Sequence, residues 1–272
     1  NVMSDFINRA PDSFSNAKYS AMRERSVGLG VMGLHSFFQQ KSIPFGSVMS
    51  KVWNKKIFKH IQEKADQASV KLAEERGPCP DAEEYGIKER FSNKTAIAPT
   101  ASISVICGGA SPGIEPIAAN SYTHKTLSGS FNVRNKYLAK ILEKHGKNDD
   151  ETWSSITTNQ GSVSHLDFLT DIEKDTFKTA FEIDQRWIVE LGADRTPNIS
   201  QAQSINVFVP ADIHKKDLHQ IHFQAWKKGL KSLYYCRSKS IQRAENVNTG
   251  SSTDVTKNVY KANKESTNEE NK

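Results

Sequence analysis

Residues 204–237 read SINVFVPADIHKKDLHQIHFQAWKKGLKSLYYCR. This stretch begins with an apolar, β-branched run at 204–210 and ends with a second run, KSLYYCR, at 231–237. Between the two runs, residues 211–229 predict a helix that stops at a glycine. A strand, a helix and a strand at this spacing predict two parallel strands of one sheet. The stretch therefore predicts an α/β fold.

Helical and strand-like patterns also alternate upstream of this unit. Residues 47–76 predict a long amphipathic helix that Gly77-Pro78 ends. We expect helices at 15–40 (with glycine interruptions), near 135–145 and at 171–192, and a strand at 128–135. The apolar face of the 47–76 helix is predicted to consist of Val48, Val52, Ile57, Ile61, Ala65, Ala68 and Leu72. Gly192 is the predicted stop of the 171–192 helix.

Composition excludes a membrane-spanning protein. The chain has 272 residues, 36% of them hydrophobic, and its mean hydropathy is −0.61. It contains no apolar run approaching the ~18–20 residues that a spanning helix needs. Its first residues show no secretory signal, and it begins with Asn rather than Met. We expect a piece of a longer protein, a processed product or a trimmed sequence.

Charge and cysteine content indicate a protein of a reducing compartment. The net charge is +6, but the basic residues are dispersed among 31 acidic ones, which indicates a solvated surface rather than direct nucleic-acid binding. Cys79, Cys107 and Cys236 are widely spaced and form no disulfide framework, so we expect a cytoplasmic location. Residues 244–272 are too polar to bury a core, and we expect a flexible tail there.

Two patterns are weak evidence for a cofactor or metal. The sequence GLGVMG at 28–33 matches GxGxxG, but it follows a helical pattern rather than a strand, and no acid lies at the distance that a dinucleotide site requires. The alternative is that these glycines let two backbones pack closely. His219 and His222 could share a helix face, but no third ligand is evident, and Phe223 and Trp226 suggest a partly buried helix instead.

Two further segments have both a chemical and a structural interpretation. Residues 98–104, APTASIS, could form an anion-binding nest or helix start, or a strand-to-turn segment whose hydroxyls cap the backbone. The adjacent tyrosines Tyr234 and Tyr235 could be strand residues, since Tyr is a good strand former. The residues themselves leave both alternatives open.

Taken together, the segments resemble the carboxyl-terminal part of the large catalytic subunit of class I ribonucleotide reductase. The resemblance covers about residues 10–243. The stretches that carry it are AMRERSVGLGVMGLHSF (21–37), LAEERGPCP (72–80), IAPTASISVICGGASPGIEP (97–116), NSYTHKTLSGSFNVRN (120–135), SQAQSINVFVP (200–210) and WKKGLKSLYY (226–235). It implies that residues 1–243 form the carboxyl-terminal part of a ten-stranded α/β barrel.

The resemblance also implies roles for two groups of residues. Pro99, Thr100, Ala101, Ser102 and Ile103 would form the loop that holds the substrate diphosphate through backbone N–H groups and hydroxyls. Many relatives have a second hydroxyl residue where Ile103 stands. Tyr234 and Tyr235 would be catalytic, as steps of a radical relay to an active-site cysteine, with Tyr235 on the incoming side. A phenol suits such a relay because it can lose a proton and an electron together.

The partners and cofactors are likewise implied by the resemblance. They are a small radical-generating subunit, a ribonucleoside diphosphate substrate, and thioredoxin or glutaredoxin as reductant. The radical cofactor, a dinuclear metal with a tyrosyl radical, would belong to the small subunit, and this chain would bind no metal.

No segment of the sequence matches the family's thiyl cysteine, its reducing cysteine pair, or its catalytic Asn and Glu, and residues 244–272 contain no cysteine. We therefore expect one piece of a split or truncated subunit, which is inactive without the amino-terminal part of the large subunit. A non-catalytic nucleotide-binding or assembly remnant is the alternative. A cobalamin-dependent relative is a third, and the double tyrosine argues against both.

Overall fold

The computed structural model describes residues 2–126 and 129–238. Within these ranges, it describes the side chains of all residues except 124–131. The predicted tail at 244–272 lies outside the described residues, and so do 239–243. The helices and strands, in chain order, are α1 (Val2–Arg9), η1 (Asp12–Phe14), α2 (Ser15–Glu24), α3 (Leu34–Gln40), α4 (Val48–Arg76), α5 (Pro80–Glu84), α6 (Ala101–Ile106), β1 (Ser121–Thr126), β2 (Gly129–Arg134), α7 (Lys136–Lys144), α8 (Asp150–Thr158), α9 (Asp171–Thr176), α10 (Gln185–Arg195), η2 (Thr196–Asn198), β3 (Val207–Val209), α11 (Lys215–Lys227) and β4 (Cys236–Ser238).

The predicted βαβ unit is confirmed. β3 pairs with β4 in parallel, with Val207 opposite Cys236, and α11 connects the two strands. Further parallel pairing extends this sheet, because Ile97 bridges Gln203 and Leu29 bridges Thr95. Within the described residues, the extended segments therefore lie in the order 27–30, 94–97, 201–209 and 234–238.

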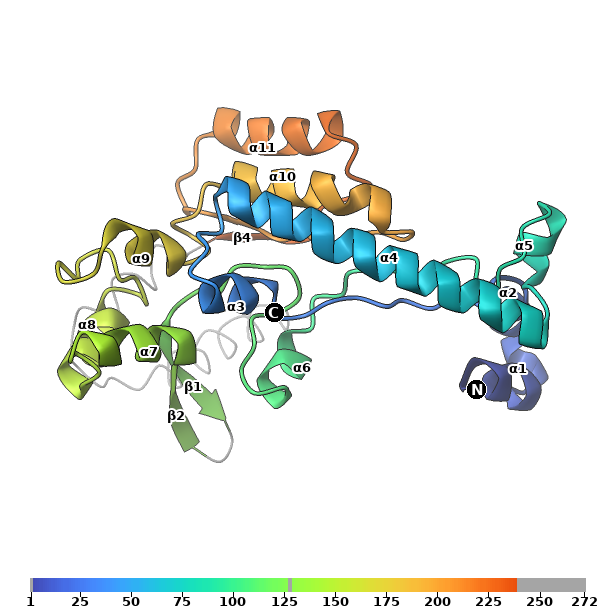
Figure 1. Cartoon of the computed structure of the whole chain (residues 1–272), viewed down its shortest axis with the longest axis horizontal. Helices are drawn as coiled ribbons and strands as arrows, with labels where there is room; N and C mark the ends of the chain where they lie inside the picture. Colours follow the sequence, from blue (N-terminus) through green and yellow to red (C-terminus); the bar gives the residue numbers. More distant parts are fainter. Residues whose placement is uncertain (1, 127–128, 239–272) are drawn as a thin grey trace, which may run out of the picture. The chain divides into compact units, whose positions relative to one another are not determined.

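These four extended segments are called the parallel set below. Helices α4, α10 and α11 cover it. Figure 1 shows α10 running between α4 and α11, and α10 packs against both of them. The main core unites α3, α4, α10 and the extended segments, with Phe38, Phe58, Ile97 and Leu191 among its buried side chains. A second cluster beneath α11 contains Val207, Val209, Ile221 and Ala225.

The long helix α4 has the predicted bounds, but its predicted apolar face is wrong: Ala68 is exposed, and none of the seven predicted residues is fully buried. Gly77 follows its last residue, as predicted, and Ser47 caps its first turn. Val48 and Val52 are exposed, however. The buried side chains are Ser50, Asn54, Phe58, Ser69 and Ala73.

The buried polar side chains of α4 have hydrogen-bonding partners. Asn54 donates to the Leu191 carbonyl at 2.9 Å and accepts from the Arg195 guanidinium at 2.8 Å. Arg195 is itself fully buried and donates to Gln203. Hydrogen bonds make these buried positions stable for polar residues. This explains why a purely apolar pattern missed the buried face.

The single helix predicted at 171–192 is two helices in the structure. α9 ends at Thr176, and α10 begins at Gln185 with Asp184 as its cap, its carboxylate accepting from the Arg186 N–H. Gly192 does not stop α10. It lies inside the helix, where an added Cβ would stand 2.9 Å from Ile205 Cδ1, so the glycine permits close packing on the strand segment.

A smaller core lies under α7, α8 and α9, beside the antiparallel hairpin of β1 and β2. Its buried side chains include Leu138, Trp153, Ile156 and Phe177. The predicted helix near 135–145 is confirmed by α7, whereas β1 is absent from the sequence prediction. In the described part of the chain, no helix is long and apolar enough to cross a membrane.

Candidate functional site

The segment 98–104 forms a turn into the short helix α6. Thr100 has a left-handed backbone (φ 50°), and its carbonyl accepts the first helical hydrogen bond, from the Ser104 N–H at 2.9 Å. As at any helix start, the N–H groups of Ala101, Ser102 and Ile103 have no acceptor within the helix. All three of these residues are exposed. The structure thus brings the predicted loop residues together at one helix start.

A second turn, residues 110–116, packs against this loop. The Gly113 N–H donates to Thr100 Oγ1 at 2.7 Å. Gly113 has a φ of 45°, and an added Cβ would stand 2.9 Å from the Ala98 carbonyl oxygen. The Thr100 hydroxyl therefore holds the neighbouring turn, and its own proton remains available for a further acceptor.

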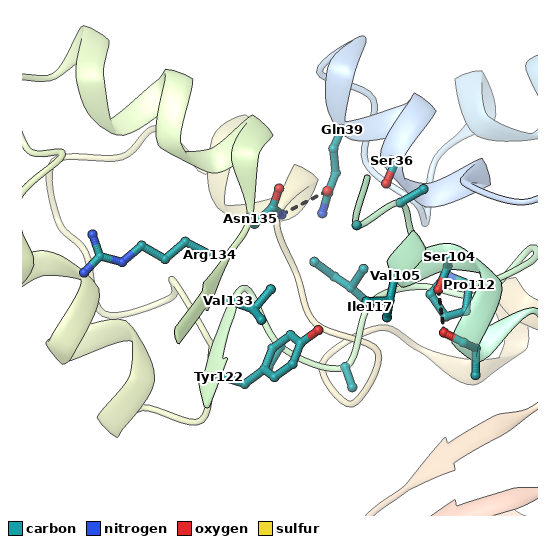
Figure 2. Close-up of a pocket in the computed structure, with 15 residues that line it drawn as sticks. Ser36, Gln39, Ser104, Val105, Pro112, Ile117, Tyr122, Val133, Arg134 and Asn135 are labelled. Carbon is teal, nitrogen blue, oxygen red and sulfur yellow. Dashed lines mark hydrogen bonds between the residues drawn. The ribbon is translucent and has the colours of Figure 1, made fainter. Parts of the chain in front are cut away.

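A cavity of about 370 Å³ lies beside α6 (Figure 2). Its walls come from Ser104 and Val105 of α6, from Gln39 of α3, and from Tyr122 and Asn135 around the hairpin. Asn135 donates to Gln39 Oε1 at 3.0 Å across the upper wall of this view. Arg134, by contrast, points away from the cavity and pairs with Asp150. The lining is mainly apolar.

The two tyrosines are in ring contact. The ring centroids of Tyr234 and Tyr235 lie 4.0 Å apart at an interplanar angle of 45°, and both side chains are about half exposed. The hydrogen bond that the Tyr234 O–H makes to Tyr235 raises the pKa of Tyr234, because a proton held in a hydrogen bond is harder to lose. The guanidinium of Arg237 lies over the Tyr235 ring, 5.6 Å from its centroid.

The backbone of the tyrosine pair is fixed by the neighbouring segment 201–209. The Tyr234 N–H donates to the Ile205 carbonyl at 2.8 Å, and the Tyr235 N–H donates to Asn206 Oδ1 at 2.9 Å. Asn206 in turn donates through Nδ2 to Glu115 Oε1. The final strand is shorter than predicted: β4 begins at Cys236, so the two tyrosines lie directly before it, and both side chains are about half exposed.

Sequence reasoning missed Glu115 and Asn206. Glu115 is 5% exposed, and burial raises its pKa to about 7, against the opposing effects of the Arg237 charge and the Asn206 hydrogen bond. Asn206 is 1% exposed. A signal exists in the sequence, because Glu115 is a single acid within a run of small and apolar residues at 108–119. An acid at such a position is buried with a partner or does chemistry.

The GLGVMG pattern has the structural explanation that the sequence suggested. Leu29 lies in the parallel set, and an added Cβ on Gly30 would stand 2.4 Å from the Ala96 carbonyl oxygen. The glycines at 28 and 30 therefore permit close approach of two backbones. Because they pack on the segment 94–97, the prediction of close packing is confirmed.

The remaining candidates were the two histidines of α11 and their aromatic neighbours. Among the described residues, no group of three His, Cys, Asp or Glu side chains is placed to hold a metal ion. The helix α11 is partly buried, as expected, but not through Phe223 and Trp226, which are 49% and 73% exposed. Ile221 and Ala225 form the buried face of α11 instead. Cys236 is an exposed free thiol.

The combination of a parallel α/β set, a loop that leads into α6 and a tyrosine pair in ring contact agrees with one protein family. The family described as "Ribonucleotide reductase, barrel domain" matches residues 1–89 and 81–236. The chain belongs to the ribonucleotide reductase family and carries part of its barrel domain.

Within this family the chain is similar to large subunits. It is 46% identical over 253 residues to the "Ribonucleoside-diphosphate reductase large subunit" of Invertebrate iridescent virus 6, covering 92% of this chain and 26% of that protein. The same subunit of Invertebrate iridescent virus 3 is 42% identical over 256 residues, covering 93% of this chain and 40% of that protein. The chain therefore spans well under half the length of either relative.

A solved structure shows the same likeness. The "Actinobacillus ureae class Id ribonucleotide reductase alpha subunit" superimposes with a TM-score of 0.82 at 39% identity. The match covers 90% of this chain and 45% of the other. The expected fold, part of the barrel domain of a reductase large subunit, is confirmed.

Proposed function

We propose that this chain is a component of ribonucleoside-diphosphate reductase, an oxidoreductase that converts ribonucleotides to deoxyribonucleotides for DNA synthesis. The observation that carries the proposal is the contact between Tyr234 and Tyr235, whose ring centroids lie 4.0 Å apart. Two phenols in contact and half exposed have little purpose in packing. Such a pair is well placed to pass an oxidising equivalent from one ring to the other.

In this proposal the loop Pro99–Ile103 holds the substrate diphosphate. The exposed helix start supplies the N–H groups of Ala101, Ser102 and Ile103, whose partial positive charge favours an anion. Ser102 adds an exposed hydroxyl. Ile103 offers its backbone N–H alone, because its side chain cannot form a hydrogen bond.

The tyrosine pair then forms the relay. An oxidising equivalent from a small radical-generating subunit reaches Tyr235, which loses an electron and a proton. Tyr235 then takes an electron and a proton from Tyr234, so the oxidising equivalent moves to Tyr234. Tyr234 is restored in the same way by an active-site cysteine, and the resulting thiyl radical abstracts hydrogen from the substrate ribose. The contact between the two rings, whose centroids lie 4.0 Å apart, supports this order of events, since it gives the oxidising equivalent a short path.

Other parts of the reaction must come from outside the 272 residues. The proposal assigns the active-site cysteines to the amino-terminal part of the large subunit, and the radical cofactor, a dinuclear metal with a tyrosyl radical, to the small subunit. Thioredoxin or glutaredoxin is the proposed reductant. The chain alone is proposed to be inactive. We also propose a cytoplasmic location, because the three cysteines are free and cytoplasmic proteins rarely form disulfides.

The test is to assemble this chain with the amino-terminal part of a large subunit and the small subunit, and to assay diphosphate reduction. Tyr234→Phe and Tyr235→Phe remove only the hydroxyls, so assembly should survive while turnover falls by at least about a hundredfold, the scale of losing one proton-transfer group. Tyr85→Phe is the control, since Tyr85 is 82% exposed and lies outside the proposed site.

Three results would count against the proposal. Retained turnover in both variants would exclude the relay, and reduction by the chain with the small subunit alone would exclude the need for an amino-terminal part. A wild-type assembly that binds diphosphates without reducing them would instead support the non-catalytic remnant.

A further inference from the structure

The turn 110–116 lies between the proposed phosphate loop and the tyrosine pair. One end of it is held by the loop, through the 2.7 Å hydrogen bond from the Gly113 N–H to Thr100 Oγ1. The close approach of Gly113 to the Ala98 carbonyl leaves no space between the two backbones. A displacement of the loop therefore has to displace the turn.

The other end of the turn is held by the tyrosine segment. Two residues beyond Gly113, the carboxylate of Glu115 accepts a hydrogen bond from Asn206 Nδ2, and Asn206 Oδ1 accepts one from the Tyr235 N–H. These two bonds use both ends of the Asn206 amide, so its orientation is fixed. Glu115 and Asn206 are 5% and 1% exposed. Water therefore cannot replace either partner without cost.

Charge adds a second connection between Glu115 and the pair. Arg237 lies over the Tyr235 ring, and its positive charge lowers the pKa of Glu115 while burial raises it to about 7. In the ionised form, the carboxylate attracts the guanidinium that covers the Tyr235 phenol. The hydrogen bond to Asn206 nevertheless remains the direct contact.

We propose that Glu115 is a positioning residue that couples the phosphate loop to the tyrosine pair through Gly113 on one side and Asn206 on the other. Substrate binding at the loop then changes the placement of Tyr235. The proposal rests on the function proposed above for both groups. It assigns Glu115 no contact with substrate, and the hydrogen bond to Asn206, rather than charge, carries the coupling.

The experiment reads the environment of Tyr235 directly. In the assembled enzyme, this chain alone carries 3-fluorotyrosine, and Tyr235→Phe identifies the ¹⁹F resonance of position 235. Saturating cytidine diphosphate should shift that resonance in the wild type. Glu115→Leu should bind cytidine diphosphate but lose the shift, whereas Glu115→Gln should keep it, because its amide oxygen still accepts from Asn206.

A matched control removes a hydrogen-bonded carboxylate elsewhere. Glu173 caps α9 and contacts His145 at the surface, so Glu173→Leu should leave the ligand-induced shift at Tyr235 intact. A shift that persists in Glu115→Leu, or is absent from the wild type with cytidine diphosphate bound, would overturn the coupling. Loss of the shift in Glu115→Gln would overturn the hydrogen-bond route.

Failure of the loop assignment gives a different result. If cytidine diphosphate does not bind, the phosphate loop of the proposed function is wrong. The coupling between the loop and the tyrosine pair is then tested without ligand, by the position of the Tyr235 resonance in loop variants. Thr100→Val removes the acceptor for the Gly113 N–H and should move the Tyr235 resonance, while Thr100→Ser keeps the hydroxyl and should leave it in place. An unmoved resonance in Thr100→Val would contradict the coupling, and this arm also serves if Glu115→Leu does not fold.

Discussion

His35 is a buried histidine that should make the fold sensitive to acid. Its ring is 0% exposed, and its Nδ1 accepts the Ile117 N–H at 3.0 Å. Burial lowers its pKa from 6.5 to about 3, so the unfolded chain binds more protons than the folded one between these values. Stability from this group is therefore complete above pH 6.5 and is lost as the pH falls toward 3.

The prediction is that His35→Asn flattens the acid side of the stability curve. Asparagine does not titrate, and its Oδ1 can replace Nδ1 as acceptor for the Ile117 N–H. Urea unfolding between roughly pH 4 and pH 7 measures the slope. Burial raises the pKa of Glu115, whose contribution has the opposite slope, so the difference between variant and wild type isolates His35. His222→Asn, at an exposed site, is the control; equal slopes in all three proteins would contradict the prediction.

At the residue scale, the sequence predicted local features better than long-range ones. The loop residues around Thr100 and the phenols of Tyr234 and Tyr235 were identified through their resemblance to a family. The structure places the first group at the start of α6 and the second directly before β4. Glu115 and Asn206 meet only after folding, because one lies in a turn and the other beside a strand 91 positions along the chain. No local pattern reports such a meeting.

At the element scale, glycines decide how closely the segments 27–30 and 94–97 approach. A Cβ on Gly30 would stand 2.4 Å from a backbone oxygen of Ala96, whereas one on Gly28 would meet the Ala96 Cβ at 3.2 Å. The first contact can be relieved only by moving the backbone. The second requires a shift of a few tenths of an ångström.

Gly30→Ala should therefore destabilise the protein by about 1–3 kcal/mol, the usual cost of overpacking, and Gly28→Ala should cost clearly less. The free energy of unfolding in urea measures both variants, and circular dichroism checks that the folded state is retained. Equal costs for the two substitutions would show that the segments do not pair as closely as the contact at Gly30 requires.

The helices show which element-scale predictions a pattern can support. The bounds of α4 were predictable because capping and stop residues are local signals. The buried face of α4 was not predictable from a local pattern. Asn54 can be buried because it forms hydrogen bonds with Leu191 and Arg195, which lie far along the chain. The break between α9 and α10 was missed for a related reason. A continuous apolar pattern concealed the cap at Asp184.

At the scale of the whole molecule, the α/β class was predictable because the strand–helix–strand spacing at 204–237 allows few other folds. The order of the segments in the parallel set was not predictable. It depends on isolated bridges, such as that between Leu29 and Thr95, and segments this short show almost no strand pattern in the sequence. In the described part of the chain, the segments 27–30 and 234–238 each have one backbone neighbour in this set. Each therefore presents an edge.

Exposed edges lead to a prediction about association. An unpaired strand edge is a template for pairing with another chain, so the 272-residue chain alone should self-associate under reducing conditions, and an amino-terminal part of the large subunit should suppress this. Light scattering against concentration measures it. Cys236→Lys places a charge on β4 and should weaken association, whereas Cys107→Lys, at an exposed cysteine next to α6, should not. A chain that stays monomeric, or equal scattering from the two lysine variants, would show that the β4 edge is not the site of contact.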